Sequence, residues 1–130
     1  MYFGGRFNYM DTAAVYEVLI LEDHEMYRPA FCALLEKSMK TVNIHEASNY
    51  KEAINILSSV KIDFAFLDIA LNHPGADHKT GIDVLKYIRT REMNIRAIML
   101  SSDKTQETID KCLDAGASGY IIKAKDAPNA

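Results

Sequence analysis

The sequence has no long apolar run and no excess of basic residues. Its apolar stretches fall far short of the roughly 20 residues of a membrane-spanning helix, and no continuous apolar core of a signal peptide stands near the N-terminus. The net charge is −3, and the lysines and arginines are scattered rather than gathered. These absences disfavour a membrane protein and a chain that binds nucleic acid directly.

Cysteine is also scarce, with only Cys32 and Cys112 in the chain. Both fall in segments with an amphipathic helical pattern, and their spacing is not that of a metal site. We therefore expect two reduced thiols in or near a core, which predicts a cytoplasmic protein. With 130 residues, 48% of them hydrophobic, the chain is long enough for one domain with an ordinary core.

Four apolar runs each end in a polar functional group. The runs and the groups that follow them are 18–21 with Glu22 and Asp23, 64–67 with Asp68, 97–100 with Ser101, and 120–122 with Lys123. Because the carboxyl ends of parallel strands meet at one edge of a sheet, we expect these groups to lie together. An acidic cluster with a hydroxyl and an ammonium suits a divalent cation and a phosphoryl group better than a hydrophobic core.

Strand-like runs alternate with helical patterns along the chain. The predicted strands are 17–21, 42–46, 62–67, 97–100 and 119–122. Helices are predicted over 25–39, from 48–49 onward, over 80–91 and from about 103 to 115. The helix-start signals are Asn49 with Glu52, Thr80 with Asp83, and Asp103 with Gln106. This alternation predicts an α/β protein with a doubly wound parallel sheet.

Four segments, in this order and at this spacing, carry a family resemblance. They read Leu-Ile-Leu-Glu-Asp-His from 19, Phe-Leu-Asp-Ile-Ala-Leu from 66, Met-Leu-Ser-Ser-Asp from 99, and Ala-Gly-Ala-Ser-Gly-Tyr-Ile-Ile-Lys-Ala from 115. From about 17 to 123 the chain resembles the receiver domain of two-component response regulators. The Glu-Asp-His and Lys-Ala segments are similar to the subfamily with a helix-turn-helix output domain. The resemblance implies a flavodoxin-like five-stranded parallel sheet in the order 2-1-3-4-5.

The resemblance also implies a role for each residue of the site. Asp68 is the expected phosphoacceptor. Mg²⁺, for which Mn²⁺ can substitute, is expected on Glu22, Asp23, Asp68 and the backbone carbonyl of Ala70. Ser101 and Lys123 are expected to bind the phosphoryl group, Ser101 and Tyr120 to form the conformational switch, and Ala70 and Asp103 to tune the lifetime of the phosphorylated state. Without a metal ion, repulsion among the carboxylates is expected to raise at least one pKa.

The expected partner is a sensor histidine kinase or a phosphotransfer protein, and a homodimer is a further candidate assembly. In this interpretation the chain controls a transcriptional output, can lose its phosphoryl group by itself, and is not a turnover enzyme. Two alternatives stay open. One is a degenerate receiver that acts as a phosphorylation-independent interaction module. The other is a phosphatase of the haloacid-dehalogenase type, against which Ala70 stands at the position of that family's second aspartate.

Two segments depart from the family pattern. Gly81 follows Asp68 by 13 residues, and the long loop between them contains His73, Asp77 and His78. These suggest a transition-metal site, although a solvated loop is favoured because no regular structure supports their spacing. Residues 1–15 are expected to form a flexible or docking leader. The receiver domain is expected over 16–130, with its fifth helix truncated at the C-terminus.

Overall fold

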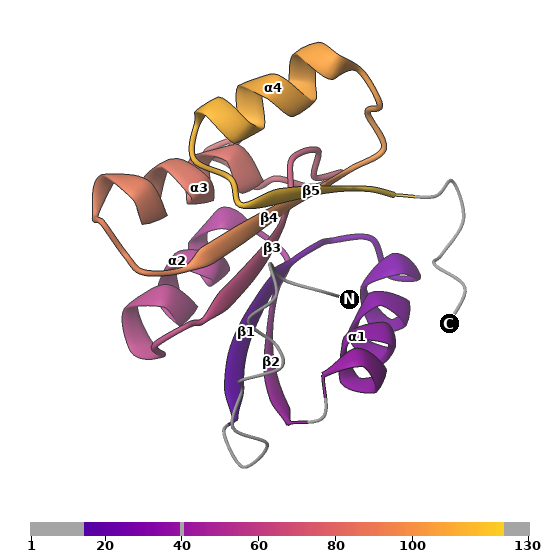
Figure 1. The fold of residues 1–130 in the computed structure, drawn as a ribbon, viewed down its shortest axis with the longest axis vertical. Coiled ribbons are helices and arrows are strands. Elements are labelled where there is room, and N and C mark those ends of the chain that lie inside the picture. The colour runs from indigo at the N-terminus through magenta and orange to yellow at the C-terminus, as the bar shows by residue number, and fades with distance from the viewer. Residues whose placement is uncertain (1–14, 40, 124–130) are drawn as a thin grey trace.

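The computed structural model describes residues 15–39 and 41–123, in which strands and helices alternate. Their order is β1 (Tyr16–Leu21), α1 (Tyr27–Ser38), β2 (Val42–Ala47), α2 (Tyr50–Ser59), β3 (Phe64–Asp68), α3 (Gly81–Thr90), β4 (Arg96–Ser101), α4 (Gln106–Asp114) and β5 (Gly119–Ile122) (Figure 1). The expected leader and the expected remnant of a fifth helix lie outside these residues, apart from Val15.

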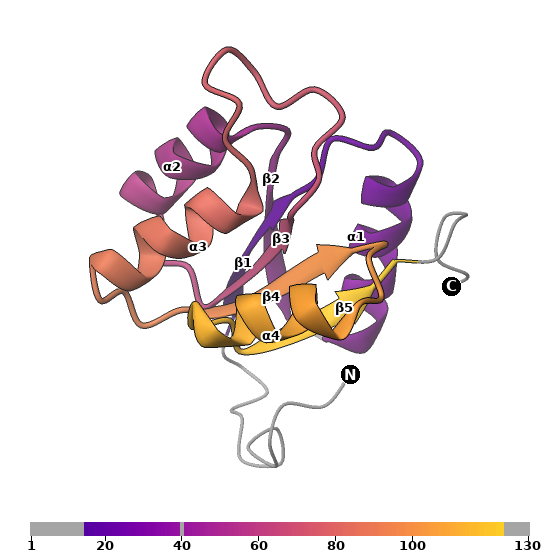
Figure 2. The same cartoon turned by 90° about the horizontal axis from the view of Figure 1, so that it is seen from above.

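The five strands form one parallel sheet in the order β2-β1-β3-β4-β5. This order confirms the predicted doubly wound, flavodoxin-like topology. Helix α1 lies on one face of the sheet, and α2, α3 and α4 lie on the other (Figures 1 and 2). All strands run in the same direction, so their carboxyl ends meet at one edge.

Alternating side chains of β1 enter two separate cores. Val18 and Ile20 pack in the core that α1 covers, whereas Leu19 and Leu21 pack in the core that α2 and α3 cover. Burial of both faces explains the continuous apolar run of this strand. The two thiols, Cys32 and Cys112, are free and buried, as the sequence predicts. None of the helices in the described part of the chain has the length and apolar character that crossing a bilayer requires.

Two of the three predicted helix starts are confirmed. The Asn49 side chain accepts a hydrogen bond from the backbone N–H of Glu52, and Thr80 and Asp83 form a capping box at the start of α3. The third was wrong, because Thr105, not Asp103, caps α4. Asp103 instead accepts a hydrogen bond from the N–H of Thr105, 2.8 Å away, and so stabilises the turn before the cap.

Candidate functional site

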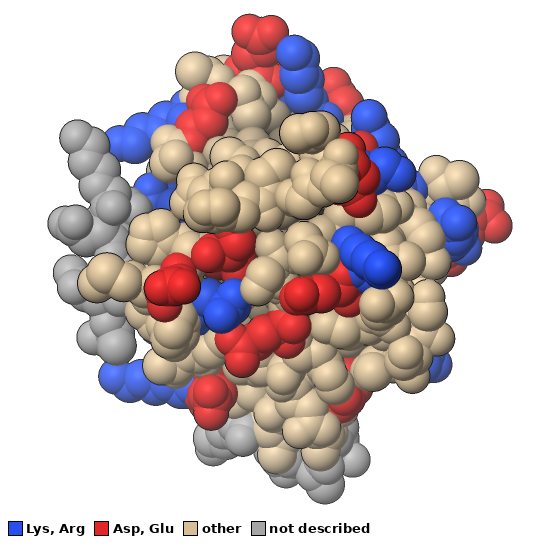
Figure 3. All heavy atoms as spheres, turned by 180° about the vertical axis from the view of Figure 1, so that it is seen from behind, with Lys and Arg blue, Asp and Glu red and all other residues tan. Residues whose placement is uncertain are grey.

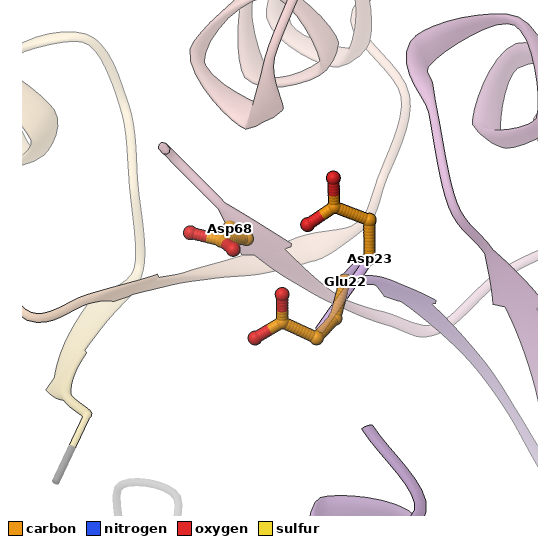
Figure 4. Close-up of side chains that lie close together, drawn as sticks. All are labelled: Glu22, Asp23 and Asp68. Carbon is orange, nitrogen blue, oxygen red and sulfur yellow. The ribbon is translucent and has the colours of Figure 1, made fainter. Parts of the chain in front are cut away.

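Three carboxylates meet where β1 and β3 end. These neighbouring strands pair in parallel with Leu21 opposite Leu67, so Glu22 and Asp68 follow at the same level. One ligand oxygen from each of Glu22, Asp23 and Asp68 lies within 4.8 Å of the others (Figure 4). Glu22 and Asp68 are almost completely buried, at 0% and 2% exposure. Three anionic groups this close together repel one another unless a cation or a proton compensates them.

Lys123, directly after β5, supplies one such cation. Its Nζ contacts Oε1 of Glu22 and lies 3.2 Å from Oδ2 of Asp68. Alternation along the strands explains the meeting, because Glu22 and Asp68 continue the series of side chains that face α1. The ammonium therefore reaches the acidic cluster from the α1 face of the sheet.

The pKa of Asp68 is raised to about 7. Burial is the largest cause, followed by the hydrogen bond and the charge of Glu22, while the N–H of Ala70 and the Lys123 ammonium act in the opposite direction. For Lys123, burial on its own would lower the pKa, but its hydrogen bond to Glu22 and the negative charges of Asp68 and Glu22 raise it overall. A carboxyl that keeps a proton near neutral pH is one that a bound metal ion can readily deprotonate.

Asp23 lies at the rim of the cluster, and the long loop between β3 and α3 folds against it. The backbone N–H groups of Asn72 and His73 donate to Oδ1 and Oδ2 of Asp23 over 3.2 and 2.6 Å. The His73 ring is 91% exposed, with Nδ1 3.9 Å from Oδ2 of Asp23. Within the described residues the only group with metal-ligand proximity is the carboxylate cluster, so the loop histidines do not gather into a site of their own.

Ser101, Tyr120 and Asp103 lie together at the end of β4. The buried Ser101 Oγ accepts a hydrogen bond from the N–H of Asp103 over 2.9 Å, and the Tyr120 hydroxyl donates to the carbonyl of Asp103 over 2.8 Å. The N–H of Thr105 and the hydroxyls of Thr108 and Thr105 lower the pKa of the Asp103 carboxyl. The Asp103 carboxylate therefore accepts hydrogen bonds from residues at the start of α4.

The donor set fits a hard divalent cation. It consists of three carboxylates without any thiolate or imidazole, and such oxygen ligands suit Mg²⁺ or Mn²⁺. Ala70 is exposed and its N–H donates to Oδ1 of Asp68 over 3.0 Å, which fixes the orientation of that carboxylate. A bound cation would compensate the negative charges of the cluster and so favour the ionised form of Asp68.

Two neighbours of the cluster were missed in the sequence. The Lys123 ammonium lies 4.6 Å from the centroid of the Tyr27 ring, and Nη1 of Arg28 donates to the carbonyl of Glu22 over 3.0 Å. Both residues belong to the first turn of α1. The sequence did carry a signal for these two neighbours, because an aromatic and a basic residue follow the Glu22-Asp23 pair within a few positions.

The charges on the molecular surface are of mixed sign. Acidic side chains gather across the middle of the face in Figure 3, with basic side chains among them. This face has no broad basic surface of the kind that follows a nucleic-acid backbone.

Comparison with known proteins agrees with this geometry. Residues 18–129 match the family model described as response regulator receiver domain. The nitrate/nitrite response regulator protein NarP of Escherichia coli (strain K12) is 30% identical over 117 residues, which make up 90% of this chain and 52% of NarP. The chain thus spans about half the length of such curated relatives. A match to relatives of this kind is consistent with the prediction that the chain belongs to the subfamily with a helix-turn-helix output domain.

Solved structures show the same fold. A DNA-binding response regulator of the LuxR family from Staphylococcus aureus superposes with a TM-score of 0.72 at 24% identity, covering 84% of this chain and 87% of the other. The chemotaxis response regulator CheY4 of Vibrio cholerae gives 0.73 at 18% identity, covering 87% and 90%. Because the family model matches residues 18–129, most of the chain, the chain belongs to the response regulator receiver domain family.

Proposed function

We propose that this receiver domain accepts a phosphoryl group on Asp68, with a divalent cation held by Glu22, Asp23, Asp68 and the backbone carbonyl of Ala70. The observation that supports this most strongly is the buried Asp68 carboxylate, with a second carboxylate and the Lys123 ammonium in contact with it. A burial this complete is costly for a carboxylate that only caps a loop. The cation, Mg²⁺ or Mn²⁺, would neutralise the charge that develops on the phosphoryl oxygens.

The proposed step is a phosphoryl transfer. An oxygen of the Asp68 carboxylate forms a bond to phosphorus while the bond to the donor breaks, and the donor's electron pair leaves with its imidazole or acetate group. Lys123 is close enough to turn from Asp68 to an oxygen of the new acyl phosphate. The Ala70 N–H holds the other oxygen of Asp68 during the attack.

The conformational response is proposed to pass through Ser101 and Tyr120. The Ser101 hydroxyl would donate to the phosphoryl group and leave the N–H of Asp103, to which it is now bound. Because Tyr120 is tied to the Asp103 carbonyl, movement of that loop would move the tyrosine as well. Beryllofluoride, a phosphoryl mimic, should therefore shift the NMR signals of the Tyr120 ring; unchanged signals would argue against this switch.

The proposed donor is the phosphohistidine of a sensor kinase or of a phosphotransfer protein in the cytoplasm. Response regulator receiver domains are generally not turnover enzymes, and the proposed role here is likewise control of an output domain or partner. Ala70 leaves the haloacid-dehalogenase interpretation without its second aspartate. The interaction-only interpretation gains no support from a site with all of its expected side chains.

Intact mass after incubation with acetyl phosphate tests the proposal. The wild-type chain should gain the mass of one phosphoryl group with Mg²⁺ and none with EDTA, while Asp68→Asn should gain none under either condition. An equal gain in Asp68→Asn would place the phosphoryl group elsewhere. If acetyl phosphate does not phosphorylate the wild-type chain, the same two proteins are compared with a phosphorylated histidine phosphotransfer domain as the donor. A wild-type chain that gains no mass from either donor would contradict the proposal.

A further inference from the structure

An aromatic ring lies against the ammonium of the site. Tyr27, the first residue of α1, presents its ring to Lys123 with Nζ 4.6 Å from the centroid. The ring is buried, at 4% exposure, and Lys123 has a side-chain exposure of 14%. A cation within about 6 Å of a ring centroid is attracted by the negative face of the ring, more strongly where water is excluded.

The surroundings of Tyr27 fix the ring in this place. The N–H of Tyr27 donates to Nδ1 of His24 over 3.0 Å, which anchors the first turn of α1. The ring also stacks on Phe31, with ring centroids 5.8 Å apart and planes 15° from parallel. Phe31 in turn contacts Phe66 of β3 edge-on, with ring centroids 5.2 Å apart. The ring is thus part of the α1-side core and is not free to turn away.

We propose that Tyr27 is a positioning residue that holds the Lys123 ammonium at the acidic cluster. This inference rests on the proposed function, since it concerns the group that would bind the phosphoryl oxygens. A bound cation and a phosphoryl group would draw Glu22 and Asp68 away from Lys123. The ring keeps attracting the ammonium in that state, and unlike a fourth carboxylate it adds no charge to the cluster.

Two variants separate the ring from the rest of the side chain. Tyr27→Phe keeps the aromatic face, and Tyr27→Leu replaces it with an alkyl group of similar burial. With acetyl phosphate and Mg²⁺, we expect Tyr27→Leu to lower the rate of Asp68 phosphorylation about fivefold and Tyr27→Phe to stay within about twofold of wild type. Equal rates for wild type and Tyr27→Leu would overturn the proposal.

A double-mutant cycle with Lys123→Gln distinguishes positioning from a general loss of structure. If Tyr27 acts through Lys123, Tyr27→Leu should change the phosphorylation rate less than twofold once the ammonium is gone. The same fivefold loss in both backgrounds would show that the ring acts only through the fold and would overturn the proposal.

The same cycle, measured by urea unfolding in EDTA, needs no phosphorylation. Tyr27→Leu should raise the unfolding equilibrium constant about fivefold more in the Lys123 background than in Lys123→Gln, and equal changes would overturn the proposed contact. A wild-type chain that takes up no phosphoryl group contradicts the proposed function. In that case the unfolding cycle alone decides whether the ring holds the ammonium.

Discussion

Asp68 combines burial, a neighbouring carboxylate and a neighbouring ammonium in one environment. The sequence predicted a raised pKa from repulsion within the acidic cluster, and the pKa is raised, to about 7. Burial is the largest single cause of this shift, ahead of the hydrogen bond to Glu22. The difference matters because repulsion disappears when a neighbour is neutralised, whereas burial remains. Asp68 is therefore expected to stay protonated in the metal-free protein up to nearly neutral pH.

This shift predicts a pH dependence of stability in EDTA. Between about pH 4 and pH 7 the folded protein keeps a proton on Asp68 that the unfolded chain has released. The free energy of unfolding should thus fall as the pH rises through this window, by up to about 1.4 kcal/mol per pH unit, and this contribution should level off above pH 7. Urea unfolding at a series of pH values measures the slope.

Asp68→Asn is the control for that slope. The amide has no proton to lose, so the variant should lack the decline and should be more stable than wild type at pH 8. Equal slopes for the two proteins between pH 4 and pH 7 would show that Asp68 is not the titrating group.

Ala70 is the residue at which the lifetime of the phosphorylated state can be tested. It is exposed and two residues after Asp68, and its methyl group cannot orient an attacking water molecule. Asp103 is engaged with Thr105 and Thr108, which leaves Ala70 as the freer position. We expect Ala70→Asn to speed self-dephosphorylation several-fold, measured by loss of the phosphorylated mass over time. Ala70→Leu is the control without a polar group, and an unchanged rate in Ala70→Asn would contradict the role.

At the scale of elements, the start of α3 depends on close contact with the end of β3. A Cβ atom added to Gly81 would lie 2.4 Å from the carbonyl oxygen of Asp68 and 2.9 Å from its carbonyl carbon. These are backbone atoms, so either the helix or the aspartate must move. Gly81→Ala should therefore lower the free energy of unfolding by about 1–3 kcal/mol and slow phosphorylation.

Gly119 in β5 provides a matched control. A Cβ atom there would lie 3.6 Å from the Ile98 side chain, which is an ordinary contact. Gly119→Ala should leave the phosphorylation rate within about twofold of wild type. Comparable losses in both variants would show that the contact between Gly81 and Asp68 has no special role.

The helix starts show which local signals the sequence carries unambiguously. Asn49 and Thr80 are each followed three residues later by an acidic residue, Glu52 and Asp83, and both helix starts were predicted correctly. Before α4, Asp103 and Thr105 stand two residues apart among several cap formers, and either could have served. The structure uses the first in a turn and the second as the cap, a choice that depends on the path of the chain after β4.

At the scale of the whole molecule, the family resemblance predicted the strand order, which the structure confirms. The meeting of Glu22, Asp68 and Lys123 was predicted from parallel strands whose carboxyl ends share one edge. The sequence did not predict the contacts made by Tyr27 or by the loop between β3 and α3. The hydrogen bonds from Asn72 and His73 join positions 49 and 50 residues away from Asp23, and no periodicity encodes the path of such a loop. The contact of Tyr27 with Lys123 depends on side-chain packing between α1 and the end of β5.

The central claim is that Asp68 becomes an acyl phosphate, and borohydride trapping tests it most directly. Borohydride reduces an aspartyl phosphate to homoserine, which peptide mass spectrometry places at a single residue. After incubation with a phosphohistidine donor and Mg²⁺, homoserine is expected at position 68 and should be absent when the donor or the metal ion is withheld. Homoserine at another position, or none in a chain whose intact mass shows the phosphoryl group, would contradict the claim.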